Sequence, residues 1–359
     1  MKHVDHMMRE AVEQQVFPGG VLWVARENQV IFFEAYGYAD IFSGSSMTRD
    51  TVFDLASLTK PLATTLLLMQ LVQKSILNLD QHITSILPCF SDPLMPQVTI
   101  RHLLAHCSGL PAYRPYYLEL MKVSGLERKK NLRKLLSQEM LIYTPGSQGL
   151  YSDLGFMVLC WILETVMGER LDRLIAEYVY GPLGLDRLFF IDLMLRERDS
   201  SHYDMAATEF CPWRNKLLKG EVHDDNAYIV GGIDGHAGLF GTAGDVGKLL
   251  LILVSDYAEK TDRFLFDSAV LKTFWSKQGS SGRALGFDMP SPVNSSCGRY
   301  FPETSIGHLG YTGGSFWIDI EDSVIVILLT NRVHPSRYNI LIRQFRPAVH
   351  NAIMKFCTG

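Results

Sequence analysis

The two ends of the chain share a pattern that its middle lacks. Residues 19–40 form two runs rich in β-branched and aromatic residues around the polar stretch 26–29, and residues 313–332 form two more around Glu321 and Asp322. Residues 2–16 carry apolar side chains at helical spacing, and residues 337–357 are again helix-like. We therefore expect one antiparallel sheet built from both chain ends and flanked by the terminal helices.

The middle of the chain is dominated by helical patterns. The clearest are residues 60–76, residues 99–110 with a threonine cap and a glycine stop, and residues 153–168 with a closing glycine. Thr242 is predicted to cap another helix. These patterns predict an α+β fold with an inserted, mostly helical region.

No repeat, low-complexity tract or long linker divides the chain, so we expect a single catalytic domain over residues 1–359. Its α/β part is expected at about residues 1–56 and 256–359, and its mostly helical part at about 57–255. The turn-rich segment 280–298 is expected to be a surface loop.

Composition excludes several classes of protein. A hydrophobic content of 47% is ample for a core, and a net charge of −4 without a polybasic stripe argues against a nucleic-acid partner. The most apolar runs are too short to span a bilayer, and the first 20 residues show no signal peptide. A cytoplasmic protein is expected, or an exported one if a leader was removed. Six widely spaced cysteines favour reduced thiols.

One stretch, FDLASLTKPLATTLLLMQLV at residues 53–72, sets Ser57 three places ahead of Lys60. Serine often caps helices, and the tetrad alone favours that interpretation. The alternative is a nucleophile: positions i and i+3 lie on one helix face, so the Lys60 amine can reach the Ser57 hydroxyl. A buried lysine with little other charge nearby can lose its proton near neutrality and act as a base.

Two further motifs are candidates for the same site. In TPGSQGLYSDLGF, residues 144–156, Tyr151 follows a Pro-Gly turn; it is either a surface side chain or a phenol that relays a proton. In IGHLGYTGGSFWID, residues 306–319, glycines precede a strand; they either allow a ligand to approach the backbone or mark a β-bulge or edge kink, and this motif alone favours the structural interpretation. His308 in that stretch could point into a cleft.

The order of these motifs, S-x-x-K, then Y-S-[N/D], then [K/H]-x-G before a strand, resembles the serine β-lactamase and penicillin-binding protein superfamily. The class C branch is the nearest match; it also holds D-alanyl-D-alanine carboxypeptidases, D-residue aminopeptidases and family VIII carboxylesterases. Segments that share this resemblance run through almost the whole chain, at residues 53–64, 99–110, 144–164, 181–186, 231–250 and 315–332.

The resemblance implies a role for each motif residue. Ser57 would attack an acyl carbon and form an acyl-enzyme, and Lys60 and Tyr151 would share the proton transfers. The backbone N–H groups of Ser57 and of Tyr311, which follows Gly310, would hold the oxyanion. His308 would orient Tyr151 or an anionic group of the substrate, and no metal or organic cofactor is needed.

Two departures from the family pattern bear on the substrate. His308 replaces the usual lysine and is a weaker anchor for a carboxylate, and Leu309 removes the neighbouring threonine hydroxyl. Asp153 replaces the usual asparagine and, when ionised, only accepts hydrogen bonds. Both changes lower the expectation of β-lactam hydrolysis and leave ester or peptide cleavage open.

Other candidates have a structural and a functional interpretation. His102 and His106 have a spacing that can bind zinc, beside Cys107, but no third ligand follows, so core or capping roles are favoured. Residues 223–225, His-Asp-Asp, could bind a cation or line the cleft. The aromatic candidates for lining an acyl pocket are Tyr113, Tyr116 and Tyr117, and a mobile surface turn is an equally good interpretation of them.

The sequence therefore predicts a serine hydrolase of small esters, amides or β-lactam-like molecules. Carboxylesterase or D-peptidase activity ranks above β-lactamase activity, because of His308 and Asp153. The alternatives are a catalytically silent ligand sensor with the same fold and a metallohydrolase that uses the histidines. The oligomeric state is not predicted.

Overall fold

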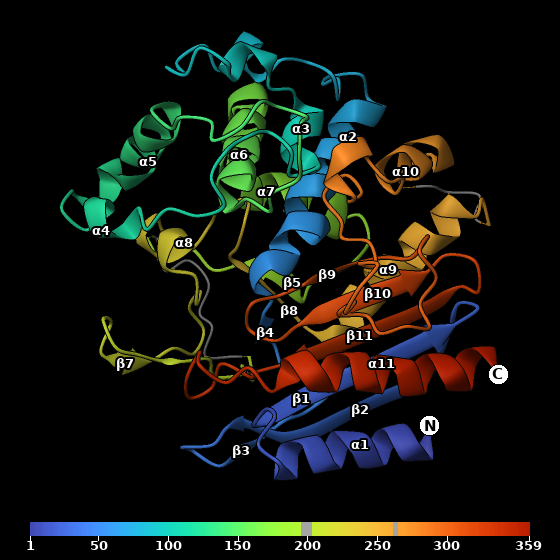
Figure 1. The fold of residues 1–359 in the computed structure, drawn as a ribbon. Coiled ribbons are helices and arrows are strands. Elements are labelled where there is room, and N and C mark those ends of the chain that lie inside the picture. Colours follow the sequence, from blue (N-terminus) through green and yellow to red (C-terminus); the bar gives the residue numbers. More distant parts are fainter. Residues whose placement is uncertain (195–202, 261–264) are drawn as a thin grey trace.

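Both ends of the chain contribute to one antiparallel sheet of six strands, in the order β3-β2-β1-β11-β10-β9 (Figure 1). The computed structural model describes residues 1–194, 203–260 and 265–359. The strands are β1 (Gly19–Arg26), β2 (Gln29–Asp40), β3 (Ser45–Ser46), β9 (Ile306–Leu309), β10 (Ser315–Asp319) and β11 (Val324–Thr330). The expected sheet, with strands from both chain ends, is confirmed.

Hairpins at both chain ends and one long-range pair between them set the register of this sheet. Glu27 and Asn28 join β1 to β2, and both have a positive φ, 51° and 64°, as a two-residue turn of the mirror type requires. In the sheet centre β1 pairs with β11, for example Val21 with Leu329. Both of these strands are buried almost throughout, so the sheet must be covered on both faces.

Helices cover the two faces of the sheet. On one face α1 (Lys2–Glu13) packs against α11 (Ile342–Thr358), as Figure 1 shows. Alternate residues of β1 serve the two faces: Leu22 joins the core under the terminal helices, and Trp23 joins the larger core on the other side. There α9 (Ala243–Tyr257) packs on β1 and β11 and presents Gly247 to the Trp23 ring.

The chain between β3 and β9 is mostly helical, with two small sheets. One sheet has the order β4-β8-β5, and the other pairs β6 with β7. These strands are β4 (Phe53–Asp54), β5 (Leu188–Phe190), β6 (Phe210–Cys211), β7 (Lys216–Leu217) and β8 (Leu239–Gly241). The remaining α-helices are α2 (Leu66–Gln73), α3 (Ile100–Leu104), α4 (Tyr117–Leu120), α5 (Arg128–Ser137), α6 (Asp153–Met167), α7 (Leu171–Ile175), α8 (Asp225–Ile229) and α10 (Ser268–Phe274).

Several helix ends lie where the sequence places them. Thr99 and Thr242 cap α3 and α9 through their side chains, and Gly168 ends α6 in the left-handed conformation. The helix expected over residues 99–110 is shorter than predicted. It ends at Leu104, because the chain turns at His106, which has a φ of 55°.

Two expected divisions of the chain differ from the observed packing. The division at residues 56 and 255 stays a prediction, although α9, which falls in the expected helical part, packs on the sheet. The surface loop expected at 280–298 is wrong in part, since Ala284, Leu285 and Phe287 are buried in the core. In the described residues no helix is both long and apolar enough to cross a membrane.

Candidate active site

Ser57 lies where β4 of the small sheet gives way to the first helical turns. It belongs to the short 3₁₀ turn η1 (Ala56–Leu58), and the π-helical turn η2 (Lys60–Thr65) follows directly. Ala56 has a φ of 47°, which is costly for a residue with a side chain. Asp54 and Thr59 hold Ala56 there, because the Asp54 carboxylate accepts its N–H at 2.8 Å and the Thr59 hydroxyl donates to its carbonyl at 2.6 Å.

This geometry excludes the helix-cap interpretation of Ser57. The N-cap residue is Leu55 for η1 and Thr59 for η2, and neither turn has a side-chain hydrogen bond at its N-cap. Ser57 instead is half-buried and lines a cavity of about 400 Å³. Its hydroxyl is accessible to a small molecule.

Lys60 is the nearest charged neighbour of Ser57. Its side chain is 0% exposed, and its Nζ donates to Ser57 Oγ at 3.1 Å, to the His236 carbonyl at 3.0 Å and to Asp153 Oδ1 at 2.7 Å. Burial alone would lower the pKa of Lys60, but the negative charge of Asp153, together with hydrogen bonds to Asp153 and Tyr151, outweighs it and raises the pKa. The expectation that little else charged surrounds this lysine is wrong, because Asp153 is its ion-pair partner.

Tyr151 lies in the loop before α6, as predicted, but it is half-buried rather than exposed. Its ring stacks on His106 with centroids 4.4 Å apart, and the Arg283 guanidinium lies 5.3 Å from its centroid. Burial raises the pKa of the Tyr151 phenol, and the charge of Lys60 and hydrogen bonds to Lys60 and Ser57 offset this only in part. The phenol therefore stays protonated and can donate.

His308 occupies the edge strand β9 and faces the same cleft. It is 1% exposed, its Nδ1 lies 2.9 Å from the Leu309 carbonyl, and its Nε2 has no hydrogen-bond partner among the described residues. Burial, followed by the charge of Lys60, lowers the pKa of His308 to about 3. The imidazole is therefore neutral. Because a carbonyl can only accept, Nδ1 carries the proton and Nε2 is a free acceptor.

The loop after β9 touches the segment that carries Ser57. A side chain at Gly310 would place its Cβ 2.8 Å from the Leu55 carbonyl, so only glycine fits. The Thr312 hydroxyl donates to the Asp54 carbonyl at 2.7 Å. The Tyr311 N–H donates no hydrogen bond within the described chain. Tyr311 and Ser57 line the same cavities, as an oxyanion site requires.

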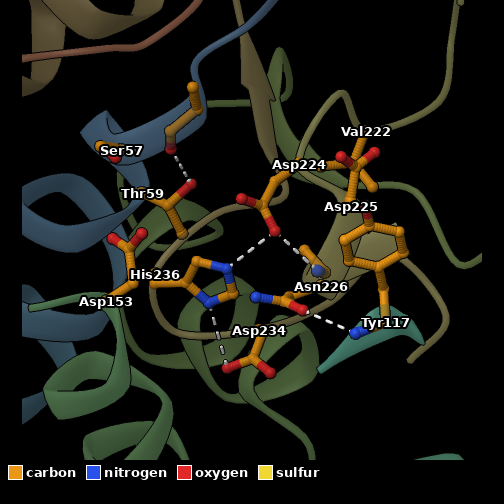
Figure 2. Close-up of polar contacts among 12 residues, drawn as sticks. Ser57, Thr59, Tyr117, Asp153, Val222, Asp224, Asp225, Asn226, Asp234 and His236 are labelled. Carbon is orange, nitrogen blue, oxygen red and sulfur yellow. Dashed lines mark hydrogen bonds and ion pairs between the residues drawn. The ribbon is translucent and has the colours of Figure 1, made fainter. Parts of the chain in front are cut away.

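An aspartate-rich wall, formed by Asp224, Asp225 and Asp234, lies beside His236 (Figure 2), and Asp224 and Asp225 line the cleft. Asp224 accepts the Ala227 N–H at 2.8 Å and lies 2.9 Å from Nε2 of His236, while Asp234 lies 3.7 Å from Nδ1 of the same ring. Burial opposes charging of His236, but Asp224 and Asp234 together raise its pKa to about 10. Asp225 pairs with Arg214 at 2.8 Å. Each aspartate of this wall thus has a cationic partner.

The stretch 223–225 therefore lines the cleft, as one of its two interpretations predicts. Of the three tyrosines considered for an acyl pocket, Tyr113 lines the cavity. Tyr116 instead donates to Glu139 at 2.7 Å, and Tyr117 stacks on Trp213.

The other histidine candidates have structural partners. His102 completes the capping box of α3 with Thr99, and Nδ1 of His106 accepts the Ser152 N–H at 3.0 Å. Burial raises the pKa of the Cys107 thiol, which makes it a poorer nucleophile. In the described parts of the chain no group of three or more His, Cys, Asp or Glu side chains is placed to hold a metal ion.

Sequence reasoning missed several residues of this site. His236, Asp234 and the arginines of a second cavity, of about 330 Å³, carry no motif of their own. The arginines reach the second cavity from segments far from Ser57 in sequence, for example Arg283 and Arg346, and the His236 carbonyl reaches Lys60.

Comparison with known proteins identifies the family. The family model described as Beta-lactamase matches residues 4–348, so the chain belongs to the β-lactamase family, within the serine hydrolase superfamily of β-lactamases and penicillin-binding proteins. An N-acetylmuramyl-L-alanine amidase of Bacillus subtilis (strain 168) is 32% identical, over 93% of this chain and 81% of its own. A protein of Escherichia coli (strain K12), named provisionally as a D-alanyl-D-alanine carboxypeptidase, is 31% identical, over 92% and 82%.

Solved structures agree with this family and confirm the β-lactamase-like fold. EstCE1, described as a hydrolase with promiscuous acyltransferase activity, is 26% identical with a TM-score of 0.71 and covers 96% of this chain and 98% of its own. The octameric penicillin-binding protein homologue from Pyrococcus abyssi is 20% identical, with a TM-score of 0.75 and coverage of 99% and 77%, and shares the fold.

Proposed function

We propose that the chain is a serine hydrolase that forms an acyl-enzyme on Ser57 and cleaves ester or amide bonds, as a carboxylesterase or D-peptidase. The observation that carries this proposal is the 3.1 Å hydrogen bond from Lys60 Nζ to Ser57 Oγ inside an accessible cleft. A nucleophile with a base in hydrogen-bond reach, itself oriented by a third group, is the arrangement that covalent catalysis needs. Here Asp153 is that third group.

The acylation step uses groups that lie together in the cleft. In its neutral form Lys60 accepts the Ser57 proton, and Oγ attacks the carbonyl carbon of the substrate. The oxygen that becomes negative is held by the N–H groups of Ser57 and Tyr311. Tyr151, a protonated phenol, donates to the departing alcohol or amine and recovers its proton from Lys60. Water then releases the acyl group from Ser57 by the same transfers in reverse.

The relatives support this class of reaction without fixing the substrate. One relative is named as an amidase and EstCE1 as a hydrolase with acyltransferase activity, and both reactions transfer an acyl group. A cavity of about 400 Å³ suits a small molecule. β-Lactamase activity ranks lower, because the neutral His308 provides no positive charge on β9. A silent ligand sensor is the remaining alternative, and a cytoplasmic location stays a prediction.

Turnover of p-nitrophenyl acetate tests the proposal. Wild type, Ser57→Ala and, as a matched control, Ser147→Ala on an exposed loop are compared, with a chromogenic cephalosporin alongside. We expect turnover that Ser147→Ala keeps and Ser57→Ala loses by at least 1000-fold, on the order of the loss when a nucleophile is removed. Equal turnover by Ser57→Ala and wild type would exclude Ser57 as the nucleophile, and no turnover of any acyl substrate would favour the sensor. Faster cephalosporin than ester turnover would reverse the ranking of activities.

A further inference from the structure

Ser57 borders two cavities, and three residues line both of them. The first cavity, of about 400 Å³, and the second, of about 330 Å³, share Ser57, Tyr151 and Tyr311. The proposed reaction uses the side chains of Ser57 and Tyr151 but only the main-chain N–H of Tyr311. The Tyr311 side chain, which is 51% exposed, is therefore a large aromatic group at the nucleophile that takes no part in the chemistry.

The Tyr311 ring contacts a wall of each cavity. It stacks on His223, which lines the first cavity, with ring centroids 5.6 Å apart and an interplanar angle of 28°. The guanidinium of Arg332, which lines the second cavity, lies 4.7 Å from the ring centroid. A ring that lines both cavities and contacts a wall of each lies between them.

Arg332 holds Tyr311 by its main chain as well as by its ring. Its Nε, at 3.0 Å, and its Nη2 both donate to the Tyr311 carbonyl, while Nη1 donates to the carbonyls of Arg337 and Asn339. Arg332 is 8% exposed, and the attraction between a cation and an aromatic ring adds to these hydrogen bonds. The position of the Tyr311 ring is therefore fixed from the side of the second cavity.

His223 fixes the ring from the side of the first cavity. The His223 N–H donates to Asp54 Oδ2 at 2.6 Å, and the other oxygen of this carboxylate accepts the Ala56 N–H at 2.8 Å. Nε2 of His223 lies 3.2 Å from the buried Glu209. The residue on which the Tyr311 ring stacks is thus tied to the turn that carries Ser57, which holds the ring and the nucleophile in one arrangement.

The two cavities differ in chemistry, so the ring separates unlike surroundings. Three aspartates line the first cavity, and four arginines line the second. A long apolar chain gains little in either, because it would displace water from charged groups without replacing their hydrogen bonds. Each cavity also lies near the lower end of the volumes of small-molecule sites. With the ring in place, each half of a substrate must fit one cavity alone.

We propose that the Tyr311 ring is a partition between the two cavities and that it limits the substrate to acyl groups short enough to fit one of them. The inference rests on the proposed function, and it narrows the substrate class to esters or amides of short or compact acids. The ring acts by its volume, so phenylalanine should replace it. Alanine should join the cavities and admit a longer acyl chain.

A series of p-nitrophenyl esters tests the partition. We compare kcat/KM for the butyrate and the octanoate, and we expect wild type to favour the butyrate by tenfold or more. Tyr311→Ala should reduce this preference at least tenfold, and Tyr311→Phe should keep it within twofold. The control Tyr338→Ala, which removes a tyrosine that is 84% exposed on the segment after β11, should leave the preference unchanged.

A ring that only stiffens the loop 310–313 gives a different result. Tyr311→Ala would then lower kcat/KM for both esters by the same factor, because the oxyanion donor would be displaced for each of them. An unchanged preference would overturn the partition. If Tyr311→Ala does not fold, Tyr311→Leu decides, and we expect it to lower the preference at least threefold. The same preference in Tyr311→Leu as in wild type would equally overturn the proposal.

A binding measurement separates failure of the partition from failure of the proposed function. Calorimetry with butanamide and octanamide, in the Ser57→Ala background, needs no acyl transfer to Ser57. With Tyr311 present, octanamide should bind no more tightly than butanamide; with Tyr311→Ala added, it should bind at least fivefold more tightly. Equal affinity for octanamide with and without the ring would overturn the partition even if the esters are hydrolysed. The expected binding in a protein that hydrolyses no ester would support the partition and contradict the proposed function.

Discussion

Replacing Asp153 by asparagine tests how the protein controls Lys60, its proposed base. Asp153 lies 2.7 Å from the Lys60 amine, and at an effective dielectric constant of about 20 two unit charges at that separation attract by about 6 kcal/mol. An asparagine oxygen keeps the hydrogen bond and loses the charge. Opposite charges at short range shift a pKa by about 1 to 3 units in proteins, and we expect Asp153→Asn to lower the pKa of Lys60 within that range.

The sign of the pH effect follows from the role of Lys60. Asp153 raises the pKa of Lys60, so its neutral, reactive form is scarce at pH 7 and kcat/KM of the wild type should keep rising from pH 7 to pH 10. In Asp153→Asn this rise should lie about 1 to 3 pH units lower. A base of lower pKa also takes protons less readily. At pH 7 kcat/KM should therefore rise by about tenfold, which is less than the increase in neutral Lys60 alone would give.

The assay is the pH profile of kcat/KM for p-nitrophenyl acetate, with Asp225→Asn as control. Asp225 lines the same cleft but pairs with Arg214, so its replacement should leave the position of the rise unchanged. A wild-type profile that is already flat at pH 7 would refute the reasoning. So would an Asp153→Asn profile that does not move, or loss of activity at every pH.

Three further predictions concern the scaffold of the site. Thr59→Val removes the hydroxyl that donates to the Ala56 carbonyl and accepts the Leu239 N–H, so urea unfolding should show a free energy of unfolding lower by about 1 to 3 kcal/mol. An unchanged unfolding midpoint would contradict this role of Thr59. Gly310→Ala brings a Cβ within 2.8 Å of the Leu55 carbonyl, so kcat should fall well below that of Gly314→Ala, where only side chains at 3.3 Å must give way; equal losses would contradict this. His236 has a pKa of about 10 when folded, above its unfolded value, so the stability that it contributes is full below about pH 6.5 and is lost as the pH rises toward 10; melting temperatures of His236→Gln should lack this decline.

Local patterns were sufficient for much of the fold. The hairpins of residues 19–40 and 313–332 and the glycine end of α6 follow from short-range rules, and the structure has them where expected. The helix at 99–110 is shorter than predicted because packing places His106 in the left-handed region, which no periodicity signals. Burial of Phe287 likewise depends on contacts with distant segments.

For the candidate site too, local motifs predict some residues, and only the folded chain brings the others together. Ser57 and Lys60 are three residues apart, so one motif shows both, and Tyr151 has its own motif. The pairing of Lys60 with Asp153 joins residues 93 apart, and it reverses the expected direction of the lysine pKa. The four arginines of the second cavity converge only in the folded chain. Residue spacing could therefore predict neither this cluster nor the pairing of Lys60 with Asp153.

Covalent labelling tests the central claim most directly. Wild type and Ser57→Ala are treated with a fluorophosphonate and with a slowly hydrolysed p-nitrophenyl ester, and intact and peptide masses are measured. The account predicts one adduct per chain, on the peptide that contains Ser57, and none in Ser57→Ala. An adduct on another residue, or equal labelling of the variant, would contradict an acyl-enzyme at Ser57.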